Sequence, residues 1–173
     1  TVGNMEVKVN GLAFDSRQVK EGAVFVAVKG TQVDGHEYIE KALESGAIAI
    51  VCEQLPASLQ PGITYVEVQN TAKALGILAS NFFENPSNNI KVVAITGTNG
   101  KTTTATLLHQ LFIRMGYSTG LLSTVENKIN DQVIPSTHTT PDAISVQALL
   151  RQMVDEGCTH CFIEASSHAI VKE

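Results

Sequence analysis

A short glycine-rich segment in the middle of the chain has the composition of a phosphate-binding loop. It reads GTNGKTT over residues 97–103. Two glycines let a backbone curl so that its N–H groups converge on an anion, and a helix that follows adds the N–H groups of its first turn. Lys101 can reach the terminal phosphates of a nucleotide, and the Thr102 hydroxyl can ligate Mg²⁺. The segment therefore predicts binding of a nucleoside triphosphate.

The loop departs from the general phosphate-loop pattern at one position. The pattern G-x-x-x-x-G-K-[ST] requires a glycine at position 95, where this sequence has Ile95. An ordinary glycine turn is the alternative, but Gly-Lys-Thr-Thr between an apolar run and an amphipathic stretch argues against it.

Glu164 is the candidate metal ligand. It stands near the end of the apolar run 161–165, which reads as a strand. In open α/β sheets, ligands gather outside the carboxyl ends of the strands. We therefore expect Glu164 to hold Mg²⁺, with a solvated strand end as the alternative.

The elements that must position these residues alternate between strand and helix patterns, which predicts an α/β fold. Strands are expected at residues 24–28, 47–51, 64–68, 91–96, 120–123 and 161–165. Helices are expected over 36–45, from a cap at Thr71, from the loop to Gly116, and from a cap at Thr140 to Gly157. The strand at 91–96 is predicted to be parallel and buried. The buried face of the helix after the loop is predicted to hold Leu107, Leu108, Leu111, Phe112 and Met115.

A polar, turn-forming run predicts the division of the chain. Residues 85–90 are expected to be a linker. Residues 1–84 before it are expected to form a small α/β domain, and residues 91–173 are expected to form the start of a larger domain.

Composition limits the class of protein. Of 173 residues, 43% are hydrophobic and 17% are charged, with a net charge of −5, which excludes a disordered chain. The acidic balance and the lack of tryptophan argue against a nucleic-acid partner. No apolar run reaches the ~18 residues of a membrane span, and the first residues are not expected to form a signal peptide. The three cysteines suit a reducing compartment, so a cytoplasmic protein is expected.

Two other residue groups could suggest chemistry. Cys158 and Cys161 have C-x-x-C spacing, but no second pair of zinc ligands is near, so we expect them to pack in a core. His168 stands close to Ser166, but no acid is placed to orient it, which argues against a hydrolase. Asp15 and Arg17 can form a surface ion pair.

Taken together, several segments resemble the Mur ligases, and among them the branch of MurE-type UDP-N-acetylmuramoyl-tripeptide synthetases. The loop at 97–103 is similar to that of Mur ligases and folylpolyglutamate synthetases, which also lacks the first glycine. The other matching segments are residues 14–17 with 22–27, 30–36, 137–142 and 164–169.

The resemblance implies a small Rossmann-like UDP-binding N-terminal domain followed by the start of a P-loop-type central ATPase domain, and it implies a role for each matching residue. ATP would be held by Gly97, Thr98, Asn99, Gly100, Lys101, Thr102 and Thr103, and Mg²⁺ by Thr102 and Glu164. Lys101 and Glu164 would be catalytic. Uridine would be contacted by Phe14 and Ser16 and by the loop residues Thr31, Gln32 and Val33. The muramoyl dipeptide would be held by His138, Thr139, Thr140 and Ser166, whereas Lys172 departs from the family pattern.

The resemblance also implies an activity, that of an ATP-dependent amide ligase of peptidoglycan synthesis. ATP would phosphorylate the D-glutamate carboxylate of UDP-N-acetylmuramoyl-L-alanyl-D-glutamate. The amine of a free amino acid, meso-diaminopimelate or otherwise L-lysine, would then displace phosphate from the acyl phosphate. The amino-acid site would lie in a domain beyond Glu173, so this chain, expected to be a monomer, should bind substrates without ligating them. The open alternatives are another Mur or folylpolyglutamate-type ligase, a P-loop NTPase switch, and a non-catalytic UDP-sugar-binding module.

Overall fold

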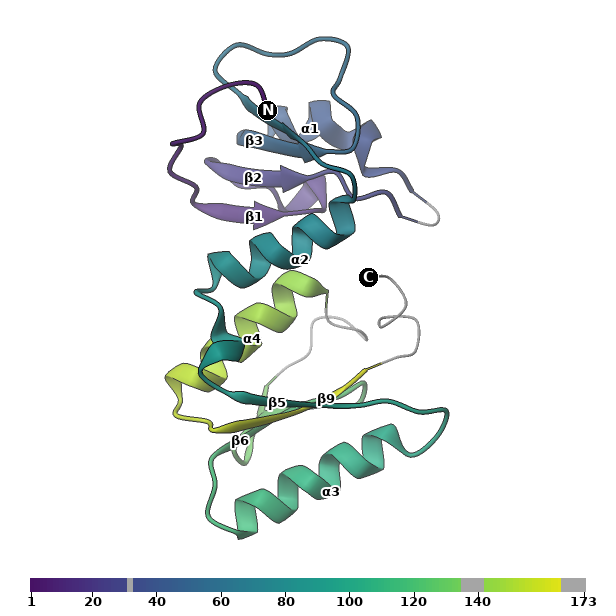
Figure 1. Cartoon of the computed structure of the whole chain (residues 1–173), viewed down its shortest axis with the longest axis vertical. Helices are drawn as coiled ribbons and strands as arrows, with labels where there is room; N and C mark the ends of the chain where they lie inside the picture. Colours follow the sequence, from purple (N-terminus) through teal and green to yellow (C-terminus); the bar gives the residue numbers. More distant parts are fainter. Residues whose placement is uncertain (31–32, 135–141, 166–173) are drawn as a thin grey trace. The chain divides into compact units, whose positions relative to one another are not determined.

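The computed structural model describes residues 1–30, 33–134 and 142–165. The chain divides into two compact units, Thr1–Phe82 and Phe83–Glu173 (Figure 1). Each unit places parallel strands against helices, so the predicted α/β class is confirmed. Among the described helices, none is long and apolar enough to cross a membrane.

The first unit is built on a parallel sheet of four strands in the order β1-β2-β3-β4. The strands are β1 (Gly11–Ala13), β2 (Ala23–Val26), β3 (Ala47–Cys52) and β4 (Thr64–Glu67). The helices are the 3₁₀ turns η1 (Ser16–Gln18) and η2 (Gly35–Tyr38) and the α-helices α1 (Ile39–Glu44) and α2 (Thr71–Phe82).

Both faces of this sheet are covered, as a parallel sheet requires. Successive side chains of a strand point to opposite faces. Phe25 of β2 packs with Ile39 and Ala42 of α1 in one core cluster. Its neighbours Val24 and Val26 are also buried, on the other face. Helix α2 packs against β1 and β3.

The second unit has a mixed sheet in the order β5-β9-β6-β7-β8, in which β5, β9 and β6 are parallel. Its strands are β5 (Lys91–Ile95), β6 (Thr119–Leu122), β7 (Asn127–Ile129), β8 (Gln132–Ile134) and β9 (His160–Glu164). Its helices are the 3₁₀ turn η3 (Pro86–Asn88), α3 (Lys101–Arg114) and α4 (Ala143–Asp155).

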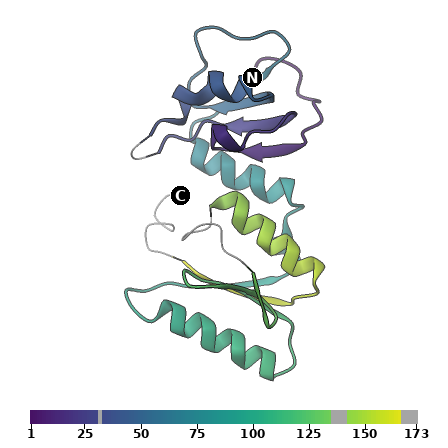
Figure 2. The same ribbon diagram turned by 180° about the vertical axis from the view of Figure 1, so that it is seen from behind.

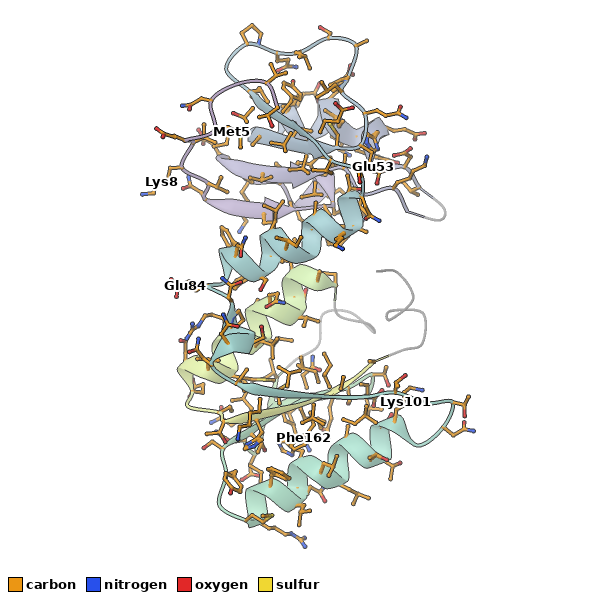
Figure 3. The ribbon with its side chains drawn as sticks, in the orientation of Figure 1. Met5, Lys8, Glu53, Glu84, Lys101 and Phe162 are labelled. Atoms are coloured by element: carbon orange, nitrogen blue, oxygen red, sulfur yellow. The ribbon has the colours of Figure 1, made fainter. Side chains whose placement is uncertain are left out.

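Helices α3 and α4 cover opposite faces of this sheet (Figures 1 and 2). Phe162 of β9 packs with Ala105 of α3, and Figure 3 shows its ring between the sheet and that helix. The preceding residue, Cys161, points the other way and packs with Leu150 and Met153 of α4. The alternation along one strand therefore builds two separate cores.

Two predictions about burial were wrong. In α3, Leu107, Leu111 and Met115 are 59%, 51% and 59% exposed. The helix instead packs through the row that contains Ala105, whose small side chain allows close approach to the sheet, with Leu108 and Phe112 partly buried. Strand β5 is parallel as predicted but exposed, because it is the end strand of the described sheet and pairs with β9 alone.

Two predicted helix caps also differ from the structure. Helix α2 is capped by Asn70, whose side-chain oxygen accepts from Lys73 N at 2.8 Å. The Thr71 hydroxyl donates instead to Glu53. Helix α4 is capped by Asp142, which accepts from Ser145 N, while Thr140 lies outside the described residues.

Candidate functional site

The phosphate loop lies where β5 leads into α3. Gly97 and Gly100 have φ angles of 147° and 77°, in the left-handed region that favours glycine. Gly100 is the N-cap of α3 and forms no side-chain cap hydrogen bond. The N–H groups of the first helical turn are therefore available to an anion.

Lys101 is the cation of this loop. Its ammonium donates to the carbonyl oxygen of Gly97 at 2.8 Å, so the side chain folds back over the loop from the start of α3 (Figure 3). Thr102 and Thr103 follow it in the first turn, and Thr98 and Asn99 are exposed at the tip. The arrangement gathers a positive charge, hydroxyl groups and backbone donors at one point.

Strand β9 brings Glu164 beside the end of the strand that leads into this loop. Glu164 is the register partner of Ile95, the last residue of β5, and Ala165 N donates to the Ile95 carbonyl at 2.9 Å. Oε2 of Glu164 accepts from the Thr124 hydroxyl at 3.2 Å. Oε1 is buried and has no hydrogen-bond partner among the described residues.

A buried carboxylate oxygen without a partner is costly, and a cation beside it would offset that cost. Mg²⁺ prefers oxygen ligands, including carboxylates and hydroxyls. The Glu164 oxygen that lacks a partner among the described residues and the hydroxyl of Thr102 therefore fit the chemistry of a magnesium site next to the phosphate loop.

The first unit contains a cavity of about 530 Å³ near the carboxyl ends of β1 and β2. Its volume suits a small organic ligand. Phe14, Ser16 and Val33 all line it, whereas Thr31 and Gln32 lie outside the described residues. The remaining lining residues are Asp15, Arg17, Phe25, Val28, Gly30, Gly35, Tyr38 and Lys41.

An ion pair occupies part of the cavity wall. The Arg17 guanidinium donates to both carboxylate oxygens of Asp15, with Nε 3.0 Å from Oδ1 and Nη2 2.6 Å from Oδ2. These hydrogen bonds hold the pKa of Asp15 below its usual value. Asp15 also accepts from the backbone N–H of Arg17, which shapes η1.

The sequence did not predict a polar network that holds residues 34–36 beside the cavity. His36 Nδ1 lies 2.6 Å from Asp34 Oδ1, and Nε2 accepts from the backbone N–H of Glu53 at 2.8 Å. Because Nε2 is an acceptor, the proton is on Nδ1. Oε1 of Glu53 accepts from the N–H and the hydroxyl of Thr71 at 3.0 and 2.9 Å, which lowers the pKa of Glu53.

Gly35 is required in this loop for reasons of space. A Cβ at this position would lie 2.7 Å from both the N and the O of Val28. The Asp-Gly-His triplet at 34–36 is the signal that could have revealed the network, since it combines a close backbone approach with two polar side chains.

The predicted sites for the muramoyl dipeptide fall outside the described residues, together with His168 and Lys172. The four residues concerned are His138, Thr139, Thr140 and Ser166. The cysteines pack in a core, as predicted, and burial raises the pKa of Cys161 to about 12. Within the described ranges, no cluster of three or more His, Cys, Asp or Glu side chains could hold a metal ion.

Two family models match the chain, one in each unit. Residues 8–83 match the model described as "Mur ligase family, catalytic domain", and residues 95–173 match "Mur ligase middle domain". The chain belongs to the Mur ligase family. The resemblance inferred from the motifs is thereby confirmed.

Curated Mur ligases from several bacteria resemble this one along almost its whole length. It is 54% identical over 171 residues to the UDP-N-acetylmuramoyl-L-alanyl-D-glutamate--2,6-diaminopimelate ligase of Cytophaga hutchinsonii, covering 98% of this chain and 35% of that protein. A protein of the same name from Bacteroides fragilis is 51% identical, with 99% and 35% covered. The chain thus spans about a third of the length of these relatives.

Solved Mur ligase structures share the fold. A structure named as a UDP-N-acetylmuramoyl-L-alanyl-D-glutamate--2,6-diaminopimelate ligase matches with a TM-score of 0.81 at 27% identity, covering 95% of this chain and 33% of the other. MurF ligase from Thermotoga maritima in complex with ADP matches with a TM-score of 0.60 at 26% identity, covering 95% and 34%.

Proposed function

We propose that this chain supplies the uridine-nucleotide site and the ATP site of a ligase that extends UDP-N-acetylmuramoyl-L-alanyl-D-glutamate by one amino acid. The observation that carries the proposal is that Glu164, one of whose oxygens is buried without a partner among the described residues, lies beside the strand that leads into the phosphate loop, in a chain whose first unit has a cavity of its own. The names of the relatives support the choice of substrate.

In this proposal, each of the two nucleotides binds to a different domain. Residues 1–84 would bind the UDP-sugar in the cavity, residues 85–90 would be a linker, and residues 91–173 would begin the ATP-binding domain. Phe14, Ser16 and Val33 line the cavity, which supports a role for their side chains in contacting the uridine end of the substrate.

In the ATP site, Lys101 would exchange its bond to the Gly97 carbonyl for the terminal phosphates, while the N–H groups of the loop and of the first turn of α3 hold the remaining oxygens. Thr102 and Glu164 would hold Mg²⁺, which supplies charge neutralisation on the phosphates. The D-glutamate carboxylate would receive the γ-phosphoryl group, and the incoming amine would then displace phosphate.

We assign meso-diaminopimelate as the incoming amino acid because the relatives are named as 2,6-diaminopimelate ligases. The residues that would select it over L-lysine are expected beyond Glu173, so this chain alone should bind both nucleotides and form no peptide bond.

A chimaera tests the proposal. The corresponding N-terminal third of the Cytophaga hutchinsonii relative is replaced by residues 1–173 of this chain, at 54% identity over the exchanged part. The purified chimaera should form the UDP-muramoyl-tripeptide and release one phosphate per product when given ATP, UDP-N-acetylmuramoyl-L-alanyl-D-glutamate and diaminopimelate.

The matched control carries Lys101→Met in the same chimaera and should lose product formation while still binding the UDP substrate. A folded chimaera that binds both nucleotides yet forms no product, although the parent enzyme does, would contradict the proposal.

A further inference from the structure

Among the charged residues that line the cavity of the first unit, Lys41 is the one without an ion pair in the described part of the chain. The cavity wall combines an apolar part, which includes Phe14, Val28 and Tyr38, with the charged residues Asp15, Arg17 and Lys41. An apolar wall suits a pyrimidine ring, and charged groups suit the polar remainder of a ligand. The charges of the wall therefore decide which polar group can enter.

Arg17 is not free to act as the cation. Its guanidinium donates to both carboxylate oxygens of Asp15 and forms an ion pair with it at 2.6 Å. A bidentate pair of this kind satisfies the carboxylate and balances its charge. A ligand phosphate that engaged Arg17 would first have to compete with Asp15.

Lys41, by contrast, makes no ion pair in the part of the chain that the structure describes. It projects from α1, which packs beside η1, the turn that contains Ser16 and Arg17. Its charge is close enough to Asp15 to contribute to the lowered pKa of that carboxyl. Lys41 therefore lies at the charged end of the cavity, and it leaves that end with one positive charge.

We propose that Lys41 binds the diphosphate of the UDP-sugar and so makes the cavity select a uridine nucleotide over uridine itself. This inference rests on the proposed function, which places a uridine nucleotide in the cavity. The ammonium is a compact charge on a flexible stem, so it can follow either phosphate. Lys41 is exposed, and the interaction should therefore weaken as the ionic strength rises.

The experiment compares the affinities of this 173-residue chain for UDP and for uridine by NMR titration, which measures weak binding and locates the perturbed amides. The variant Lys41→Met keeps the length of the side chain and removes the charge. Lys41→Arg keeps the charge. Lys73→Met removes an exposed charge from α2 that does not line the cavity, and so controls for the overall field of the unit.

We expect Lys41→Met to weaken UDP binding about tenfold, the size of one charge-assisted contact, and to leave the affinity for uridine within about twofold. Lys41→Arg and Lys73→Met should bind UDP nearly as the parent chain does. The UDP affinity of the parent chain should also fall more steeply with salt than that of Lys41→Met.

Three results would overturn the inference in distinguishable ways. If UDP binds the cavity equally well in the parent chain and in Lys41→Met, Lys41 is not the phosphate ligand, although the proposed function stands. If Lys41→Met weakens uridine as much as UDP, its role is structural. If the folded parent chain binds neither UDP nor uridine, the proposed function fails and the inference fails with it.

Discussion

At the scale of single residues, the central feature is the carboxylate of Glu164. One oxygen accepts from the Thr124 hydroxyl and the other is buried without a partner in the described chain, next to a loop that presents Lys101. Leaving a buried acceptor unpaired costs about 1–3 kcal/mol. Such a cost is common at functional sites, where a ligand supplies the missing contact.

Glu164→Gln should remove most of the dependence of ATP binding on Mg²⁺, because a neutral amide is a much weaker ligand for a hard cation than a carboxylate. The measurement is the ratio of ATP affinities with Mg²⁺ and with EDTA. We expect Thr124→Val to reduce that ratio partially and Thr124→Ser to preserve it, since Thr124 holds Glu164 through its hydroxyl. An unchanged ratio in Glu164→Gln would argue against a metal at this position.

Lys101→Met should weaken Mg-ATP binding by about tenfold or more, because the loop loses its only side-chain cation among residues 97–103. Calorimetric titration measures the change. Lys91→Met, an exposed lysine at the start of β5, is the matched control and should bind ATP normally. UDP binding should be the same in both variants.

Among the elements of the first unit, η2 and the preceding residue Asp34 are connected by hydrogen bonds to the end of β3 and, through Glu53, to the start of α2. The Asp34–His36 pair holds the backbone of Glu53 just after β3, and the Glu53 carboxylate holds Thr71 at the start of α2. Lys29 and Asp34 also form a β-bridge, which closes the base of the loop. The network therefore couples the loop at the cavity to the rigid frame of the first unit.

This network predicts a pH dependence of stability in the first unit. The pKa of Glu53 is lowered by its hydrogen bonds from Thr71, and that of Asp34 by its hydrogen bonds from His36. Carboxyls with lowered pKa stabilise the fold above their unfolded pKa values, and the contribution is lost as the pH falls through the folded values. Unfolding should therefore become easier as the pH drops below about 4.5, the ordinary value for Glu.

Amide hydrogen exchange in β2 and β3 measures this stability at successive pH values. Glu53→Gln should be less stable than the parent chain at pH 7 and should lose less stability on acidification. Glu67 is exposed at the end of β4, so Glu67→Gln should show the same dependence of stability on pH as the parent chain. Identical curves for Glu53→Gln and the parent chain would show that the carboxylate of Glu53 does not contribute.

Helix α3 offers a direct test of which apolar row is buried. Leu108 packs against the core of Phe162 and Leu121, whereas Leu111 is 51% exposed. Leu108→Ala should lower the free energy of unfolding by about 2 kcal/mol. Leu111→Ala should change it by about 0.5 kcal/mol or less. Amide hydrogen exchange in β9 measures the stability of both variants. A larger loss of stability in Leu111→Ala than in Leu108→Ala would indicate that the face expected from the sequence is the buried one.

At the scale of the whole molecule, long periodic elements and the phosphate loop were predictable from sequence, and the short elements were not. Strands β1, β7 and β8 have three residues each, too few for a period to emerge. Which row of α3 is buried depends on the side chains that let the helix approach the sheet. The spacing of the five apolar residues alone could therefore not predict which row faces the sheet.

The residues of the candidate site differ in the same way: those within one continuous motif can be read from the sequence as a group, whereas the proximity of the others depends on the order of the strands. Gly97, Gly100 and Lys101 form a continuous motif, whereas Glu164 meets the loop only because β9 inserts between β5 and β6. In the cavity, residues from Phe14 to Lys41 come together through the connection from β1 to β2 and the connection from β2 to α1, which no local pattern reveals. Lys41 therefore escaped the motif analysis.

We propose above that this chain contains two independent nucleotide sites, one in each unit. Calorimetric titration with UDP-N-acetylmuramoyl-L-alanyl-D-glutamate and with Mg-ATP, each alone and each after saturation with the other, tests it most directly. We expect saturable binding of one molecule of each nucleotide, with UDP competing for the first site and not the second. Binding of ATP by a folded chain that ignores both uridine ligands, or mutual displacement of the two nucleotides, would contradict it.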